Sequence, residues 1–142
     1  NMKRVYPVLF TKTNDDKDTI LIEVPDLGAM TEGYGMADAI EMARDVIGMA
    51  GITKEDNGEE LPEATEFDKV DAAKGTFAAD GETYASLVDV DFDAYRRKVD
   101  MKSVRRNVTL PNWLNVEADK AGINVSKVLQ DALMSVLNVS RG

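Results

Sequence analysis

The carboxy-terminal segment, residues 103–142, limits the fold of this chain more than any other stretch. Its pattern predicts a short strand over 103–110 and then two helices, with Pro111 ending the strand and Gly122 separating the helices. A lone strand leaves its backbone N–H and C=O groups unsatisfied, and no second strand lies nearby in the sequence. The segment therefore predicts a homodimer through residues 103–137, in which two copies of the strand form a two-stranded ribbon.

Polarity alternates along this predicted strand. One face is apolar, and the other presents a cation, an amide and a hydroxyl from Arg105, Asn107 and Thr109. Such groups hydrogen-bond well to base edges, and a two-stranded ribbon fits the DNA major groove. We therefore expect Arg105 to read guanine and Asn107 to read adenine, whereas Thr109 contacts a thymine methyl group or a phosphate.

The second predicted helix of this segment begins after Asn124, which stands at the N-cap position. The amides at a helix start and the helix dipole favour an anion, so Asn124, Val125, Ser126 and Lys127 are candidate phosphate contacts. A plain helical hairpin with an ordinary Asn cap is the alternative. The helix carries an unbroken apolar stripe at helical spacing, made of Val125, Val128, Leu129, Ala132, Leu133, Val136 and Leu137.

The same segment resembles the ribbon-helix-helix family of DNA-binding domains. The matching positions are the strand end 108–111, then Leu114, Ala118, Ala121, Gly122, Asn124, Ser126, Leu129 and Leu133. Arg106 departs from the pattern, because the family prefers an apolar residue there. The resemblance implies a dimer whose paired strands enter the major groove of a palindromic operator. The dimer core is then expected to contain Val108, Leu110, Leu114, Ala118, Val128, Leu129, Ala132 and Leu133.

The charge of the chain is unevenly distributed. The overall net charge of −9 alone argues against nucleic-acid binding, but residues 101–142 carry +3 and residues 1–100 carry −12. We interpret this difference as a tail that meets phosphate and a body that meets a basic partner while resisting DNA. An acidic surface that only keeps the protein soluble is the alternative.

The first 100 residues predict a separate folding unit of the α+β class: a small antiparallel sheet with one packed helix, followed by the dimeric ribbon-helix-helix domain. We expect domains at 2–93 and 103–142, joined by a linker at 94–102. The predicted elements are strands at Arg4–Thr13, Thr19–Val24, Ala29–Tyr34 and Tyr84–Asp93, and an amphipathic helix at Met36–Gly48.

Three local signals refine this picture. Pro7 cannot donate to a strand ladder, which predicts that the first strand is an edge strand or that Pro7 stands at a strand start. Gly51 is a plausible stop for the helix. The polar, acidic stretch from Thr53 to Lys74 lacks a clear pattern and predicts a long loop or a frayed turn.

This amino-terminal part resembles the HicB antitoxin family. The resemblance rests on the segments 6–10, 22–27 and 31–33 and on the helix opening Ala37–Ala39. It implies a lobe with a partial RNase H-like fold, which binds a small basic HicA-type ribonuclease, and a protein that represses its own operon. Candidate toxin-binding residues are the acidic side chains of Asp15, Asp16, Asp18, Glu23 and Asp26.

Catalytic and metal chemistry is weakly supported. The chain has no histidine and no cysteine, which argues against zinc or nickel sites and thiolate chemistry. Asp89, Asp91 and Asp93 would share one strand face, but neighbours on such a face lie roughly 6.8 Å apart, too far for three ligands of one ion. We therefore expect no enzyme activity, no cofactor and no metal. A metal-dependent nuclease remains a minor alternative.

No apolar run approaches the ~20 residues that span a bilayer, so we expect a cytoplasmic protein without a membrane partner. The prediction is an antitoxin that binds its toxin and represses its operon as a dimer, and a higher oligomer is left open. The main alternative is a stand-alone ribbon-helix-helix repressor whose amino-terminal lobe senses a small ligand in an apolar pocket.

Overall fold

The structure is a computed structural model that describes residues 2–100 and 103–140. It divides into two compact units, Asn1–Val99 and Asp100–Gly142. The predicted linker at 94–102 contains two residues, 101 and 102, that lie outside the described part, as does the end of the predicted domain at 103–142. No helix in the described residues is long and apolar enough to cross a membrane.

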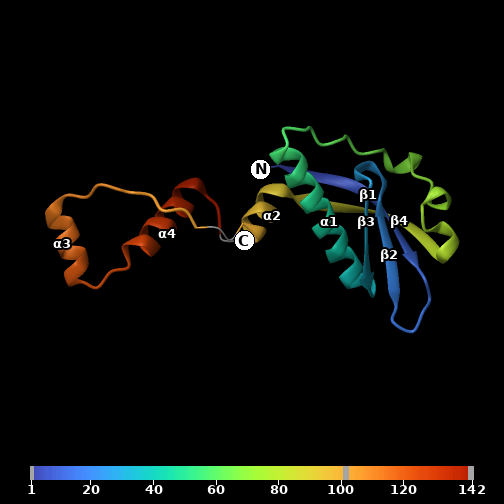
Figure 1. Ribbon diagram of the computed structural model, residues 1–142, viewed down its shortest axis with the longest axis horizontal. Coiled ribbons are helices and arrows are strands. Elements are labelled where there is room, and N and C mark those ends of the chain that lie inside the picture. Colours follow the sequence, from blue (N-terminus) through green and yellow to red (C-terminus); the bar gives the residue numbers. More distant parts are fainter. Residues whose placement is uncertain (1, 101–102, 141–142) are drawn as a thin grey trace. The chain divides into compact units, whose positions relative to one another are not determined.

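The first unit is built on a four-stranded antiparallel sheet with the strand order β3-β2-β1-β4 (Figure 1). All four predicted strands are present: the second and third have the predicted bounds, and the first and fourth are shifted by one and two residues. The α+β class of the chain is confirmed. Their bounds are Lys3–Lys12 for β1, Thr19–Val24 for β2, Ala29–Tyr34 for β3 and Glu82–Asp91 for β4.

The expectation that Pro7 marks an edge strand or a strand start is wrong. β1 lies inside the sheet, and Pro7 stands in the middle of it, paired with Leu87 of β4. Its pairing with β2 covers only Leu9 to Lys12, so β2 has already ended where Pro7 would need to donate. An internal strand therefore accommodates proline because one of its neighbours is short.

Helix α1, Met36–Asp56, packs on one face of the sheet and is longer than predicted. Gly51 does not end the helix but lies buried within it. A Cβ at Gly51 would overlap the ring of Phe92, and a Cβ at Gly48 would lie 2.6 Å from the ring of Tyr95. These glycines let the aromatic rings pack directly against the helix backbone, so their role is close approach and not termination.

The core lies between α1 and the sheet. β1 and β2 contribute alternate side chains, as the period-two pattern of a half-buried strand requires. The buried cluster consists of Tyr6, Val8, Phe10, Ile20, Ile22, Val24, Ala39, Ala43, Ile47, Val88, Val90 and Phe92.

Residues 57–81, which we call the strap, connect α1 to β4. The predicted loop at Thr53–Lys74 starts too early, because α1 continues to Asp56. The strap contains three short 3-10 turns, η2 (Phe67–Lys69), η3 (Ala72–Lys74) and η4 (Ala78–Asp80). It covers the sheet face opposite α1: a Cβ at Gly75 would lie 2.9 Å from Cδ1 of Leu9, whose side chain is buried there.

Helix α2, Phe92–Val99, occupies most of the predicted linker. The predicted strand end at Asp93 is also wrong, because β4 stops at Asp91 and the chain turns into this helix. Arg96 of α2 forms ion pairs with Glu55 and Asp56 at the end of α1, at 3.5 and 3.0 Å. The segment 92–99 is therefore a packed part of the first unit.

The second unit contains α3, Asn112–Lys120, and α4, Val125–Leu137, as predicted. Gly122 has a φ of 66°, and the N–H of Ile123 bonds the carbonyl of Ala118 at 3.1 Å, which closes α3 with a left-handed glycine cap. Residues 103–111 have no assigned strand in this single chain.

Candidate nucleic-acid interface and acidic surface

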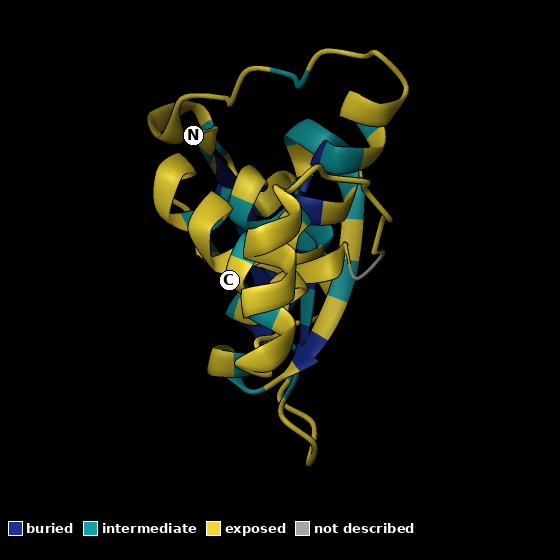
Figure 2. Cartoon of the chain, turned by 90° about the vertical axis from the view of Figure 1, so that its left-hand side faces the viewer, coloured by how far each residue is buried: buried dark blue, intermediate teal, exposed yellow. Residues whose placement is uncertain are grey.

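The second unit leaves its apolar residues exposed (Figure 2). Among the described residues 103–140 none is buried, and only Ala118, Leu129 and Met134 are half-buried. Val136 is 81% exposed and Trp113 is 68% exposed. Helices with such open apolar stripes need a covering surface, because each large apolar side chain gains ~1.5–3 kcal/mol on full burial. The predicted dimer-core residues therefore form an uncovered surface in one copy.

The predicted base-contacting residues Arg105, Asn107 and Thr109 are all exposed. They lie in the irregular segment before α3, and the single chain provides no strand beside them. In the single chain these three side chains are accessible, but they are not aligned on one face of a strand. Their alternation remains a prediction that depends on pairing with a second copy.

The predicted phosphate contacts lie at the start of α4. Asn124 is the N-cap, as predicted, and its side-chain oxygen accepts the N–H of Lys127 at 3.1 Å. The amide of Lys127 is therefore not free, contrary to our expectation. The ammonium of Lys127 pairs with Asp131 at 3.0 Å. Val125 and Ser126 are exposed residues in the first turn of α4, where backbone N–H groups have no partner within the helix.

Three of the predicted toxin-binding residues lie in the turn between β1 and β2. Asp15 accepts the N–H groups of Thr19, at 2.8 Å, and Lys17, at 3.2 Å. The hydrogen bond from the Thr19 backbone is the main reason that the pKa of Asp15 is lowered. Asp18 has a φ of 54°, and its carbonyl accepts the N–H of Gly35. Asp16 is exposed in the same turn.

The other two predicted toxin-binding residues hold the strap. Each carboxylate accepts both the backbone N–H and the hydroxyl of one threonine: Glu23 from Thr76, at 2.9 and 2.6 Å, and Asp26 from Thr65, at 2.9 and 2.6 Å. The sequence reasoning missed both threonines, since no local pattern indicates a contact across 39 or 53 residues. The five acidic residues thus lie at opposite ends of β2 and not in one patch.

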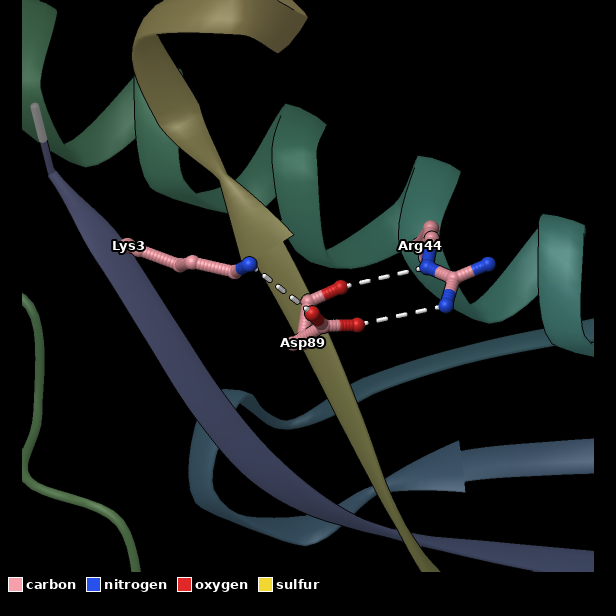
Figure 3. A network of polar contacts seen from close by, with 3 residues as sticks. All are labelled: Lys3, Arg44 and Asp89. Atoms are coloured by element: carbon pink, nitrogen blue, oxygen red, sulfur yellow. Dashed lines mark hydrogen bonds and ion pairs between the residues drawn. The ribbon is translucent and has the colours of Figure 1, made fainter.

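The three aspartates considered for metal binding have separate partners. Asp89 is held by Lys3 of β1 and Arg44 of α1, at 3.3 and 3.2 Å (Figure 3). The hydrogen bond from Arg44 is the main reason that the pKa of Asp89 is lowered. Asp91 accepts the N–H of Ala94 at the start of α2, and Asp93 lies in α2. Within the described residues, no group of three or more metal-binding side chains forms.

The described residues of the first unit line surface hollows, of which two contain candidate residues or lie beside them. The larger, of about 460 Å³, contains Met2, Arg4 and Leu61 and is walled by Glu55, Glu59, Glu60 and Glu63. The smaller, of about 260 Å³, lies under the strap beside Leu9, Glu23 and Asp26. Charged side chains line both hollows, and the acidic wall of the larger one was not among our candidates.

Comparison with known proteins relates most of the chain to one family. The family model of the HicB-like antitoxins of bacterial toxin-antitoxin systems matches residues 6–132. A solved toxin-antitoxin complex from Streptococcus pneumoniae has the same fold, with a TM-score of 0.60 and 24% identity over 94% of this chain and 99% of that one. The crystal structure of the antitoxin HicB from Burkholderia pseudomallei is 23% identical, with a TM-score of 0.49 over 94% of this chain and 96% of that one. No curated protein matches. The chain belongs to the HicB-like antitoxins of bacterial toxin-antitoxin systems.

Proposed function

We propose that this antitoxin binds and neutralises a small HicA-type mRNA interferase and represses its own operon by binding a palindromic operator as a homodimer. Family membership supports an antitoxin role, and the Streptococcus pneumoniae neighbour is itself a toxin-antitoxin complex. In this proposal the first unit binds the toxin and the second unit, with residues 103–140, dimerises and binds DNA.

The exposed apolar surface of the second unit carries the dimer proposal. Val128 and Leu133 of α4 are each about half exposed, and α3 adds Leu114. A second copy covers these side chains with the same side chains of its own helices, which is the self-complementary contact of a two-fold dimer. In that dimer the residues 103–110 of two copies pair and satisfy each other's backbone groups.

The paired strands present Arg105, Asn107 and Thr109 on one face to the major groove. Their side chains are exposed and carry the donor and acceptor groups that distinguish bases. The start of α4 then holds a phosphate through the amides of Val125 and Ser126, with Asn124 fixing the helix end. The positive net charge of residues 101–142 favours this contact over one with the acidic first unit.

The DNA proposal is tested with the triple variant Arg105→Ala, Asn107→Ala and Thr109→Ala and the DNA upstream of the operon. Each good base contact contributes ~1–3 kcal/mol of discrimination, so loss of all three lowers specific affinity by at least about 100-fold. The control is Arg106→Ala, which removes the same charge from the neighbouring position on the other strand face. It is expected to weaken binding slightly and equally for all sequences. Operator affinity equal to wild type in the triple variant would contradict the proposal.

The toxin proposal is tested by co-expression with the small basic protein encoded in the neighbouring reading frame. We expect relief of growth arrest and a complex that copurifies with the full chain. The triple variant keeps both properties, because its substitutions lie in the second unit. Growth arrest that persists despite folded antitoxin, with no complex, would contradict toxin neutralisation and leave the operator proposal standing.

A further inference from the structure

Strand β1 has a neighbour on both sides over only part of its length. It pairs with β4 from Lys3 to Lys12, but with β2 only from Leu9 to Lys12. Beyond that point the chain leaves β2 through the short turn η1 (Pro25–Leu27), and no other strand of the described residues takes its place. The first part of β1 is therefore an open edge on the side of β2. Such an edge is a template for pairing with another chain.

The hydrogen bond just beyond β1 indicates which residues face this edge. The N–H of Thr13 bonds the carbonyl of Thr19, which places Thr13 on the side of β2. In an antiparallel strand the N–H and C=O of one residue point to the same side, and successive residues alternate. The odd-numbered residues of β1 therefore point to the side of β2. There the backbone groups of Lys3 and Val5 have no hydrogen-bond partner among the described residues.

The larger hollow, of about 460 Å³, lies beside this edge. Met2 and Arg4, on either side of Lys3 in the sequence, line it together with Leu61 at the start of the strap (Figure 1). The strap is joined to β1 just beyond the hollow, because the hydroxyl of Tyr6 donates to the carbonyl of Pro62 at 2.6 Å. The hollow therefore separates the open edge from the first residues of the strap.

The wall opposite β1 is acidic. It consists of four glutamates, at positions 55, 59, 60 and 63, and Arg4 is the one cation among the described residues that line the hollow. Two of the glutamates are paired with cations of the fold, whereas Glu60 and Glu63 form no ion pair within the described part of the chain. A segment that enters the hollow is therefore favoured if it carries positive charge.

We propose that an extended, basic segment of the toxin adds to β1 as a strand beside Lys3 and Val5, with cationic side chains against Glu60 and Glu63. In such strand addition the backbone hydrogen bonds hold the segment, and side chains at alternate positions give specificity. The pairing is short, because the strap is bound to β1 at Tyr6. The inference rests on the proposed function, since it takes the toxin as the partner and identifies where it docks.

Proline substitution tests the backbone pairing. Val5→Pro removes an N–H that points to the open edge and leaves the bonds to β4 in place. Met30→Pro is the matched control on β3, where Gly35 donates to Asp18 on the β2 side and the N–H of Met30 therefore points outward. By calorimetry with the neighbour-encoded toxin, we expect Val5→Pro to weaken binding about tenfold and Met30→Pro to stay within about twofold of wild type.

Hydrogen exchange of the unaltered chain gives a second readout that needs no substitution. The Val5 amide is expected to exchange rapidly in the free chain and at least about 100-fold more slowly in the toxin complex, whereas the Met30 amide does not change. Rapid exchange of the Val5 amide in both states overturns the strand addition. Slow exchange already in the free chain also overturns it, because the edge would then be occupied.

Charge reversal tests the acidic wall. Glu60→Lys with Glu63→Lys is expected to lower toxin affinity at least about tenfold, and more than the control Asp16→Lys with Glu32→Lys, which makes the same charge change at exposed sites. An equal loss in both pairs overturns the site. Loss in the hollow pair with no effect of Val5→Pro means that the toxin docks by charge alone. A toxin that binds every variant like wild type refutes this docking site only, whereas no complex with wild type contradicts the proposed function itself.

Discussion

Gly51 provides the sharpest test of how α1 packs. A methyl group at this position would overlap Cε1 of Phe92 and lie 2.6 Å from its Cδ1. Phe92 is 2% exposed and lies in the main core cluster, so its ring cannot swing into solvent. Gly51→Ala therefore forces either the ring or the helix to move.

Two opposing effects set the magnitude. Alanine favours the helix over glycine by ~1 kcal/mol, because it restricts the unfolded chain. Overpacking of a close-packed core costs ~1–3 kcal/mol. We expect the clash to prevail, with a net loss of about 1 kcal/mol in the free energy of unfolding. In a Phe92→Leu background, which lacks the aromatic Cε and Cζ atoms, the same substitution is expected to stabilise by up to about 1 kcal/mol.

The measurement is urea denaturation of the four proteins of this double-mutant cycle at one fixed protein concentration, followed by far-ultraviolet circular dichroism. The single tryptophan, Trp113, lies in the second unit and reports separately on it by fluorescence. Its transition is expected to stay unchanged. The reasoning is refuted if Gly51→Ala has the same effect with Phe92 and with leucine at that position.

Three further predictions concern single polar contacts. Because hydrogen bonds lower the pKa of Asp89 in the folded state, its stabilising contribution is complete above the unfolded pKa of ~4 and is lost as pH falls through the lower, folded value. The urea midpoints of wild type and Asp89→Asn should thus differ at pH 7 and converge in acid. Asn124→Ala removes the cap of α4, and we expect a loss of ~1 kcal/mol in the Trp113 transition. Glu23→Gln weakens the charged contact with Thr76, so hydrogen exchange of that amide should accelerate roughly tenfold, for ~1.5 kcal/mol of lost hydrogen bonding.

The elements that sequence predicted well have signals within a few residues. β-forming residues, turn residues and, in the fourth strand, alternation located all four strands. Gly122 and the Asn124 cap marked the end of α3 and the start of α4. Such signals act through the local backbone, so no knowledge of the rest of the fold is required. The same holds for the apolar stripe of α4, which is a property of its helical period.

Two of the errors concern residues whose role depends on a distant part of the chain. Gly51 is a residue type that often ends a helix. Here the ring of Phe92, 41 residues later, occupies the space that a side chain at position 51 would fill. Pro7 lacks a backbone N–H, which is typical of edge strands. Because the pairing with β2 covers only Leu9 to Lys12, no N–H is needed at position 7 although β1 lies inside the sheet. Glycine and proline each have more than one structural role, and the rest of the fold determines which role applies at these positions.

The roles of the acidic residues also depend on contacts with distant parts of the chain. These contacts indicate which acidic surface is the best candidate for toxin binding. Glu23 and Asp26 already accept hydrogen bonds from the strap, and Asp15 accepts those of its own turn, so binding a cation there competes with bonds that hold the fold. The wall of the larger hollow differs, since Glu60 and Glu63 of the strap are exposed and, among the described residues, form no hydrogen bond that holds the strap to the sheet. A cationic partner gains most binding free energy at carboxylates that are otherwise solvated, because binding there breaks no hydrogen bond of the fold. The hollow beside Met2 and Arg4 is therefore the acidic surface on which charge reversal should reduce toxin association without loosening the sheet.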